Sequence, residues 1–86
     1  MQAEIYSKDY CPSCVSAKAL LNQRGIDYTE IDAVTEREAL IERVTADTGK
    51  APATVPQIYL DGSHIGGYEA LVAYFKRMDY QSDDAA

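Results

Sequence analysis

Cys11 and Cys14 are the only cysteines in this chain, and they stand three positions apart. Cysteines at this spacing lie on one side of a helical turn, where their Cα atoms can reach the roughly 4.4–6.8 Å separation of a disulfide. A disulfide that closes so short a loop would stabilise the fold little, because the stabilisation grows with loop length. We therefore expect the pair to be chemically active.

The residues around the pair favour a reactive thiolate at Cys11. A strand is expected before it and a helix after it, so Cys11 lies at a helix N-terminus, where unpaired amides and a partial charge of about +0.5 favour a thiolate. Lys8 adds a positive charge, and Pro12 suits the first helical position because it has no amide proton to leave unpaired. Such surroundings lower a cysteine pKa from about 8.5 into the range of roughly 3.5–7.5. We predict that Cys11 is the nucleophile and that Cys14, one turn inside the helix, is the resolving thiol.

Two alternatives to a reactive pair remain open at this point. A Cys-x-x-Cys pair can be half of a zinc site, but the chain has no third cysteine and a single histidine, His64. A tetrahedral site would then need carboxylate ligands or a second subunit. The other alternative is two unreactive buried cysteines. We expect no metal, and we expect His64 to be a solvent-facing strand residue.

The length and charge of the chain narrow the functional classes. Its 86 residues form one domain, and its 47% hydrophobic content is ordinary for a folded protein. A net charge of −6 argues against nucleic-acid binding, which normally needs a basic patch. The chain contains no run of about 18 apolar residues, so no membrane span is predicted. The first residues lack a basic segment followed by an apolar one, so we expect no signal peptide and a cytoplasmic location.

Turn signals and hydrophobic periodicity divide the chain into seven elements. Apolar residues between positions 14 and 21 predict a broad buried stripe on the first helix, which Gly25 ends. Thr35 and Glu38 form a capping box that is expected to start the second helix, which ends at Gly49. Gly67 precedes the third helix. Strands are expected at residues 3–7, 27–31, 57–60 and 63–65.

The order of these elements, β-α-β-α-β-β-α, predicts an α/β fold with a four-stranded mixed sheet flanked by three helices. The first two strands are expected to be parallel, and the last two to form an antiparallel hairpin around Asp61 and Gly62. This is the smallest form of the thioredoxin-like architecture, for which a Cys-x-x-Cys pair near a βαβ unit is the sequence cue.

Three motifs in this order resemble the glutaredoxin family: Tyr10-Cys11-Pro12-Ser13-Cys14, Thr54-Val55-Pro56-Gln57 and Gly62-x-x-Ile65-Gly66-Gly67-Tyr68. The resemblance implies that residues 1–80 form a glutaredoxin domain, and we expect residues 81–86 to be a disordered acidic tail. It also implies an oxidoreductase that uses glutathione to reduce protein disulfides and glutathione mixed disulfides. Such an enzyme serves electron transport and cell redox homeostasis, and we expect a monomer.

The resemblance further implies a role for each matching residue. Cys11 corresponds to the nucleophile, Cys14 to the resolving cysteine and Pro56 to a cis-proline. The backbone of the two residues before Pro56 would meet the glutathione cysteine like an added strand, and the start of the third helix would hold a carboxylate. The residues expected to bind glutathione are Lys8, Tyr10, Thr54, Val55, Pro56, Gly67, Tyr68 and Glu69, with Lys8, Tyr10, Pro12 and Pro56 supporting the reaction.

Departures from the family pattern keep two other functions open. Ala70 stands where the family often has an aspartate, and Ala53 where it often has a basic or polar residue. A glutaredoxin-like electron donor to ribonucleotide reductase, itself reduced by thioredoxin reductase, is therefore one alternative. An iron–sulfur cluster carrier is the other, since the small Ser13 would permit a cluster, although Pro12 stiffens the loop.

Overall fold

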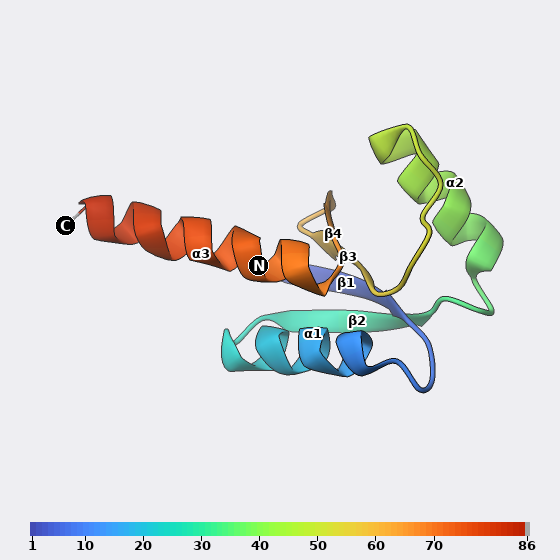
Figure 1. Ribbon diagram of the computed structural model, residues 1–86, viewed down its shortest axis with the longest axis horizontal. Coiled ribbons are helices and arrows are strands. Elements are labelled where there is room, and N and C mark those ends of the chain that lie inside the picture. Colours follow the sequence, from blue (N-terminus) through green and yellow to red (C-terminus); the bar gives the residue numbers. More distant parts are fainter. Residues whose placement is uncertain (86) are drawn as a thin grey trace.

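The computed structural model describes residues 1–85, and it describes side chains up to residue 79. Its element order agrees with the order predicted from the sequence (Figure 1). The elements are β1 (Gln2–Ser7), α1 (Pro12–Gln23), β2 (Asp27–Asp32), α2 (Arg37–Thr48), β3 (Gln57–Leu60), β4 (Ser63–Gly66) and α3 (Tyr68–Ala85).

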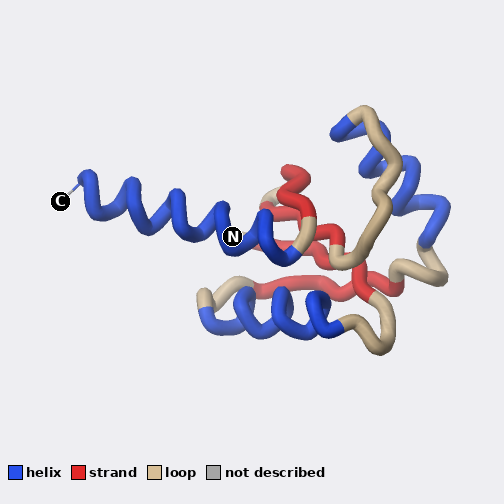
Figure 2. Tube along the Cα trace, viewed as in Figure 1, coloured by secondary structure: helices blue, strands red, loops and turns tan. Residues whose placement is uncertain are grey.

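The four strands form one mixed sheet in the order β2-β1-β3-β4 (Figure 2). Strands β1 and β2 are parallel, whereas β3 is antiparallel to both β1 and β4. The predicted parallel pair and hairpin are therefore both confirmed. In the register between β1 and β3, Ile5 lies opposite Ile58 and Tyr6 lies opposite Gln57.

Successive residues of the central strands point to opposite faces of the sheet, and each face carries its own core. Helices α1 and α3 pack side by side on one face, against Ile5, Ile58 and Leu60. Helix α2 packs on the other face, where Leu40 and Val44 meet a smaller cluster. Because all four residues of β3 are buried, this strand carries both cores.

Arg43 attaches α2 to the sheet through polar and aromatic contacts. Its guanidinium donates two hydrogen bonds to the Glu4 carboxylate, at 2.8 and 2.9 Å, and one to the Tyr6 hydroxyl at 3.0 Å. It also lies 3.7 Å from the centre of the Tyr59 ring, and the Tyr59 hydroxyl donates to Asp47 at 2.7 Å. The hydrogen bonds from Arg43 hold the pKa of Glu4 below its ordinary value. Helix α2 thus depends on charged contacts as well as on its small apolar core.

The predicted capping box at the start of α2 is wrong. The N-cap is Glu36, which makes no side-chain capping bond. The Thr35 hydroxyl instead donates to Asp32, whose carboxylate also accepts the Val34 and Thr35 amides. An aspartate at a strand end readily forms such a turn with the residues that follow it. Thr35 is therefore engaged before the helix begins.

One further expectation differs from the structure. The buried stripe of α1 is narrower than predicted, because Ala19 is exposed and Val15 keeps 62% of its surface exposed. Helix α3 continues through Ala85, and the disordered acidic tail expected at residues 81–86 stays a prediction. Ala86 lies outside the described residues, and the domain boundary at residue 80 stays a prediction.

Among residues 1–85, no helix is both long and apolar enough to cross a membrane.

Gly66 is expected to be the glycine least tolerant of substitution, because two constraints meet there. Its φ is +120°, and an added Cβ would lie 3.2 Å from the Ala70 Cβ. Gly66→Ala is therefore expected to lower the free energy of unfolding by about 1–3 kcal/mol. Gly62→Ala is the matched control, since Gly62 also has a positive φ but open space around it. Equal losses for both variants in urea unfolding would contradict this expectation.

Candidate active site

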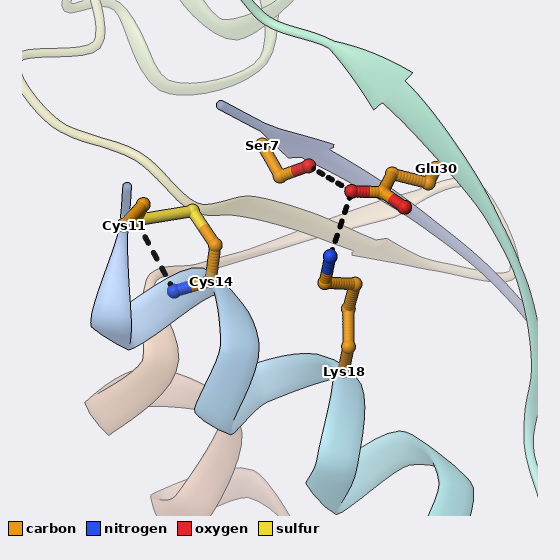
Figure 3. Close-up of polar contacts among 5 residues, drawn as sticks. All are labelled: Ser7, Cys11, Cys14, Lys18 and Glu30. Atoms are coloured by element: carbon orange, nitrogen blue, oxygen red, sulfur yellow. Dashed lines mark hydrogen bonds and ion pairs between the residues drawn. A yellow bond between two sulfur atoms is a disulfide. The ribbon is translucent and has the colours of Figure 1, made fainter. Parts of the chain in front are cut away.

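The start of α1 holds the two cysteines in contact (Figure 3). Cys11 is the N-cap residue, with an extended backbone, and its sulfur accepts a hydrogen bond from the Cys14 amide at 3.2 Å. The two form a disulfide with a Cα–Cα distance of 5.2 Å. Cys11 is 8% exposed and Cys14 is 1% exposed, so Cys14 lies deeper, as predicted. Cys11 is thus the sulfur that a substrate reaches first.

A second segment, Thr54–Pro56, lies against the cysteines. The Val55–Pro56 peptide bond is cis, as the resemblance implied, and Pro56 is fully buried directly before β3. The Val55 carbonyl oxygen lies 3.9 Å from the Cys11 sulfur. The backbone of this segment therefore forms one wall beside the reactive sulfur.

The residues predicted for the site come together in three adjoining surface pockets. The first contains Cys11 and shares Lys8 with the second, and the second shares Thr54 and Val55 with the third. Lys8, Tyr10, Cys11 and Pro12 line the first pocket; Lys8, Thr54 and Val55 line the second; and Thr54, Val55, Pro56, Gly67, Tyr68 and Glu69 line the third. Cys14 does not line these pockets, because it is buried behind Cys11. The Tyr10 side chain is fully exposed, on a backbone with a φ of +57°.

Two cations of the site are not held in salt bridges. Within the part of the chain whose side chains are described, neither Lys8 nor Arg37 forms an ion pair. Both line the pocket that contains Thr54 and Val55. Sequence analysis did not identify Arg37. The sequence feature that could have identified Arg37 is a basic residue in the first turn of a helix, where the macrodipole favours acidic residues.

Sequence analysis also missed a charged network behind Cys11. Lys18 forms an ion pair with Glu30 at 2.8 Å, and the buried Ser7 donates a hydrogen bond to the same carboxylate oxygen at 2.5 Å (Figure 3). Lys18 and Glu30 line the pocket that contains Cys11. The hydrogen bonds from Lys18 and Ser7 hold the pKa of Glu30 below its ordinary value, and the bond to Glu30 raises the pKa of Lys18. The charge of Lys18 is therefore largely balanced by Glu30, whereas Lys8 and Asp9, which line the same pocket, form no ion pair among the described side chains.

Lys18 could have been noted from its spacing. It follows Cys14 by four residues, so both side chains lie on one face of α1, and helical side chains point back toward the N-terminus. Its partner on β2 could not be identified, because that contact depends on how α1 packs across the sheet. Within the described residues, no group of three or more metal-ligating side chains converges.

Comparisons with known proteins agree with this geometry. The glutaredoxin family model matches residues 3–65. Glutaredoxin 3 of Escherichia coli K12 is 42% identical over 73 residues, which cover 81% of each chain. A glutaredoxin of Pseudomonas aeruginosa is 39% identical over 71 residues, covering 80% of this chain and 79% of that one.

Solved structures show the same relationship. The buckwheat glutaredoxin–glutathione complex superposes with a TM-score of 0.72 at 28% identity, covering 87% of this chain and 68% of that one. The dithiolic glutaredoxin 2-C-Grx1 of Trypanosoma brucei brucei gives a TM-score of 0.73 at 30% identity, covering 93% and 82%.

The four-stranded mixed sheet with a Cys-x-x-Cys pair at the start of α1 is a thioredoxin-like fold with a redox-active site. More narrowly, the chain belongs to the glutaredoxin family. Its class of activity is thiol–disulfide oxidoreduction, and Cys11 and Cys14 form its Cys-x-x-Cys pair.

The depressed pKa of Glu30 predicts a loss of stability in acid. A carboxylate whose pKa is lowered on folding stabilises the native state above its unfolded pKa of about 4.3, and this contribution disappears as the pH falls through the lower native pKa. Because the pair is partly exposed, Glu30→Gln is expected to cost about 0–1 kcal/mol at pH 7 and nothing near pH 2.

Urea unfolding at the two pH values measures this difference. Glu42→Gln is the control, because Glu42 is exposed and forms no ion pair among the described side chains. A larger cost for Glu30→Gln at low pH than at neutral pH would show that the ion pair does not stabilise the native state.

Proposed function

We propose that the protein is a glutathione-dependent oxidoreductase that reduces protein disulfides and glutathione mixed disulfides. The observation that carries this proposal is the position of the Cys11 sulfur, which accepts the Cys14 amide and lies 3.9 Å from the Val55 carbonyl oxygen. This sulfur stands at a helix N-terminus beside pockets that could receive a short peptide. The similar buckwheat structure is a complex with glutathione, which supports the same ligand here.

The reaction on a glutathione mixed disulfide needs only Cys11. Its thiolate attacks the glutathionyl sulfur, a Cys11–glutathione disulfide forms, and the substrate leaves as a thiolate that takes up a proton. A second glutathione thiolate then attacks the glutathionyl sulfur of this disulfide. Oxidised glutathione leaves and Cys11 returns to its thiolate. The helix N-terminus and Lys8 favour that thiolate in both steps.

Reduction of a protein disulfide also uses Cys14. The Cys11 thiolate attacks one substrate sulfur and the other sulfur leaves as a thiolate. Cys14 then attacks the Cys11 sulfur, which releases the second substrate thiol and forms the Cys11–Cys14 disulfide. Two glutathione molecules reduce this disulfide and leave as oxidised glutathione. The Cys11–Cys14 disulfide is the oxidised form in this proposed cycle.

Recognition of glutathione is proposed to use both ends of the tripeptide. The Val55 backbone would pair with its central cysteine, as an added strand does. Lys8 and Arg37 would attract the glycine carboxylate into the pocket they share. The amides of Tyr68 and Glu69, at the start of α3, would bind the γ-glutamyl carboxylate, because a helix N-terminus attracts anions.

A second candidate function rests on Ala70. This alanine lines the pocket at the start of α3. It stands where the family often has an aspartate, so the carboxylate that would meet the amino group of glutathione is missing. The protein would then be a donor to ribonucleotide reductase that thioredoxin reductase reduces. For both candidates we propose a monomer in a reducing compartment such as the cytoplasm, where such a pair is kept reduced.

Replacing each cysteine separates the two reactions. Cys11→Ser is expected to abolish both activities. Cys14→Ser is expected to keep the turnover of a glutathionylated peptide while losing reduction of a protein disulfide, because only the second reaction needs a resolving thiol. Steady-state assays on the two substrates measure this. Substantial turnover by Cys11→Ser would contradict the role of Cys11 as the nucleophile. An equal loss of both activities in Cys14→Ser would contradict the role of Cys14 as the resolving thiol.

The source of electrons decides between the two candidate functions. Turnover of a small mixed disulfide is measured with glutathione and glutathione reductase, and in parallel with thioredoxin reductase alone. The proposed function expects turnover in the first system to exceed that in the second by at least about tenfold, a difference of about 1.4 kcal/mol in barrier height. The reverse preference would establish the second candidate.

A further inference from the structure

A chain of two side-chain hydrogen bonds joins His64 to the wall of the active site. The Gln57 Nε2 group donates to the Thr54 carbonyl oxygen at 2.8 Å, and the Gln57 Oε1 atom lies 2.8 Å from the His64 Nε2 atom. We propose that Gln57 and His64 are positioning residues, which orient the Thr54–Val55 peptide for the thiol-bearing substrate. The proposal deepens the proposed function and rests on it, because it assumes that the substrate pairs with this peptide.

The direction of both hydrogen bonds follows from chemistry. The Thr54 carbonyl can only accept, so the Gln57 amide nitrogen must face it. The Gln57 oxygen then faces His64, and His64 must present Nε2–H as the donor. No other arrangement satisfies all three groups. Gln57 is 7% exposed, and leaving its oxygen without a partner would carry a desolvation cost.

The Thr54–Val55 peptide needs such an anchor because no strand holds it. Both residues lie before β3, outside the hydrogen-bonding ladder of the sheet. The Gln57 side chain, from the first residue of β3, supplies a bond that a neighbouring strand would otherwise supply. The orientation of the peptide is thereby tied to the sheet.

This anchor has a direct consequence for substrate binding. In a trans peptide the carbonyl oxygen and the following N–H point in opposite directions, and the only cis bond in the described residues is Val55–Pro56. Holding the Thr54 oxygen toward Gln57 therefore turns the Val55 N–H away from it. Among the described residues, no group accepts a hydrogen bond from that N–H. It remains available to a ligand in the pockets that Val55 lines.

His64 is itself held in place by packing. The sequence predicted a solvent-facing residue, which is wrong: the ring is half-buried, with its centre 5.2 Å from that of Tyr59 at 72°. Tyr59 is fully buried and its hydroxyl bonds Asp47. His64 lines none of the three site pockets. It acts on the site through Gln57 and is not a catalytic base.

The test compares variants that break the chain of hydrogen bonds with one that breaks a neighbouring bond. Gln57→Met and His64→Phe each remove one link while keeping similar bulk. His64→Gln keeps an amide donor and is expected to restore function in part. Tyr59→Phe is the control, because it removes a hydrogen bond from the same strand that does not reach Thr54.

The expected result is a split between the two kinetic constants. KM for a glutathionylated peptide is expected to rise about threefold to tenfold in Gln57→Met and His64→Phe, because substrate binding loses the contribution of one hydrogen bond. The value of kcat is expected to stay within about twofold. Tyr59→Phe is expected to lower thermal stability without changing KM. An unchanged KM in both Gln57→Met and His64→Phe, or an equal rise of KM in Tyr59→Phe, would overturn the proposal.

A second readout does not depend on glutathione. Nuclear magnetic resonance of the reduced protein reports the Val55 amide signal directly. Gln57→Met and His64→Phe are expected to shift this signal, and Tyr59→Phe is expected to leave it in place. If the unmodified protein failed to turn over glutathione substrates, the proposed function would fail. An unshifted Val55 signal in both Gln57→Met and His64→Phe would instead overturn the positioning role.

Discussion

The pairing of β3 with β1 is the constraint on which the rest of the structure depends. It joins distant parts of the chain, with Gln57 opposite Tyr6 in the register, and both strands continue into active-site segments. The loop after β1 leads to Cys11, and the segment before β3 ends at Pro56. One antiparallel register therefore sets the 3.9 Å approach of the Val55 carbonyl oxygen to the Cys11 sulfur. Strand β3 carries both cores, so the site rests on the most buried part of the sheet.

The electrostatics of the site run against those of the whole chain. The chain carries a net charge of −6, yet the reactive sulfur accepts an amide at a helix N-terminus and shares a pocket with the unpaired Lys8. Glu30 could have opposed this local positive potential. Its charge is instead balanced by Lys18 in a salt bridge on the edge of the same pocket. A thiolate at Cys11 is thus favoured locally by the helix N-terminus and by Lys8, which forms no ion pair among the described side chains.

The errors of sequence analysis share one cause. The Thr35 capping box, the exposed His64 and the broad stripe on α1 were each inferred from neighbours along the chain. Each was overruled by a contact or a packing arrangement that such neighbours do not define. Asp32 engages Thr35, Gln57 and Tyr59 hold His64, and the geometry of packing on the sheet leaves Val15 exposed. Local patterns predict which element a residue belongs to better than they predict which partner its side chain will find.

The sequence by itself determined the element order, the mixed sheet, the helix ends at Gly25 and Gly49, and the reactive pair, because these follow from periodicity, backbone preference and short-range spacing. The ordered motifs also indicated the residues that gather around the pair. Only the tertiary structure decided that Arg37 joins Lys8, that Glu30 balances Lys18, and that His64 reaches Thr54 through Gln57. The physical reason is that these contacts link side chains from different elements, whose meeting depends on how the helices and strands pack together.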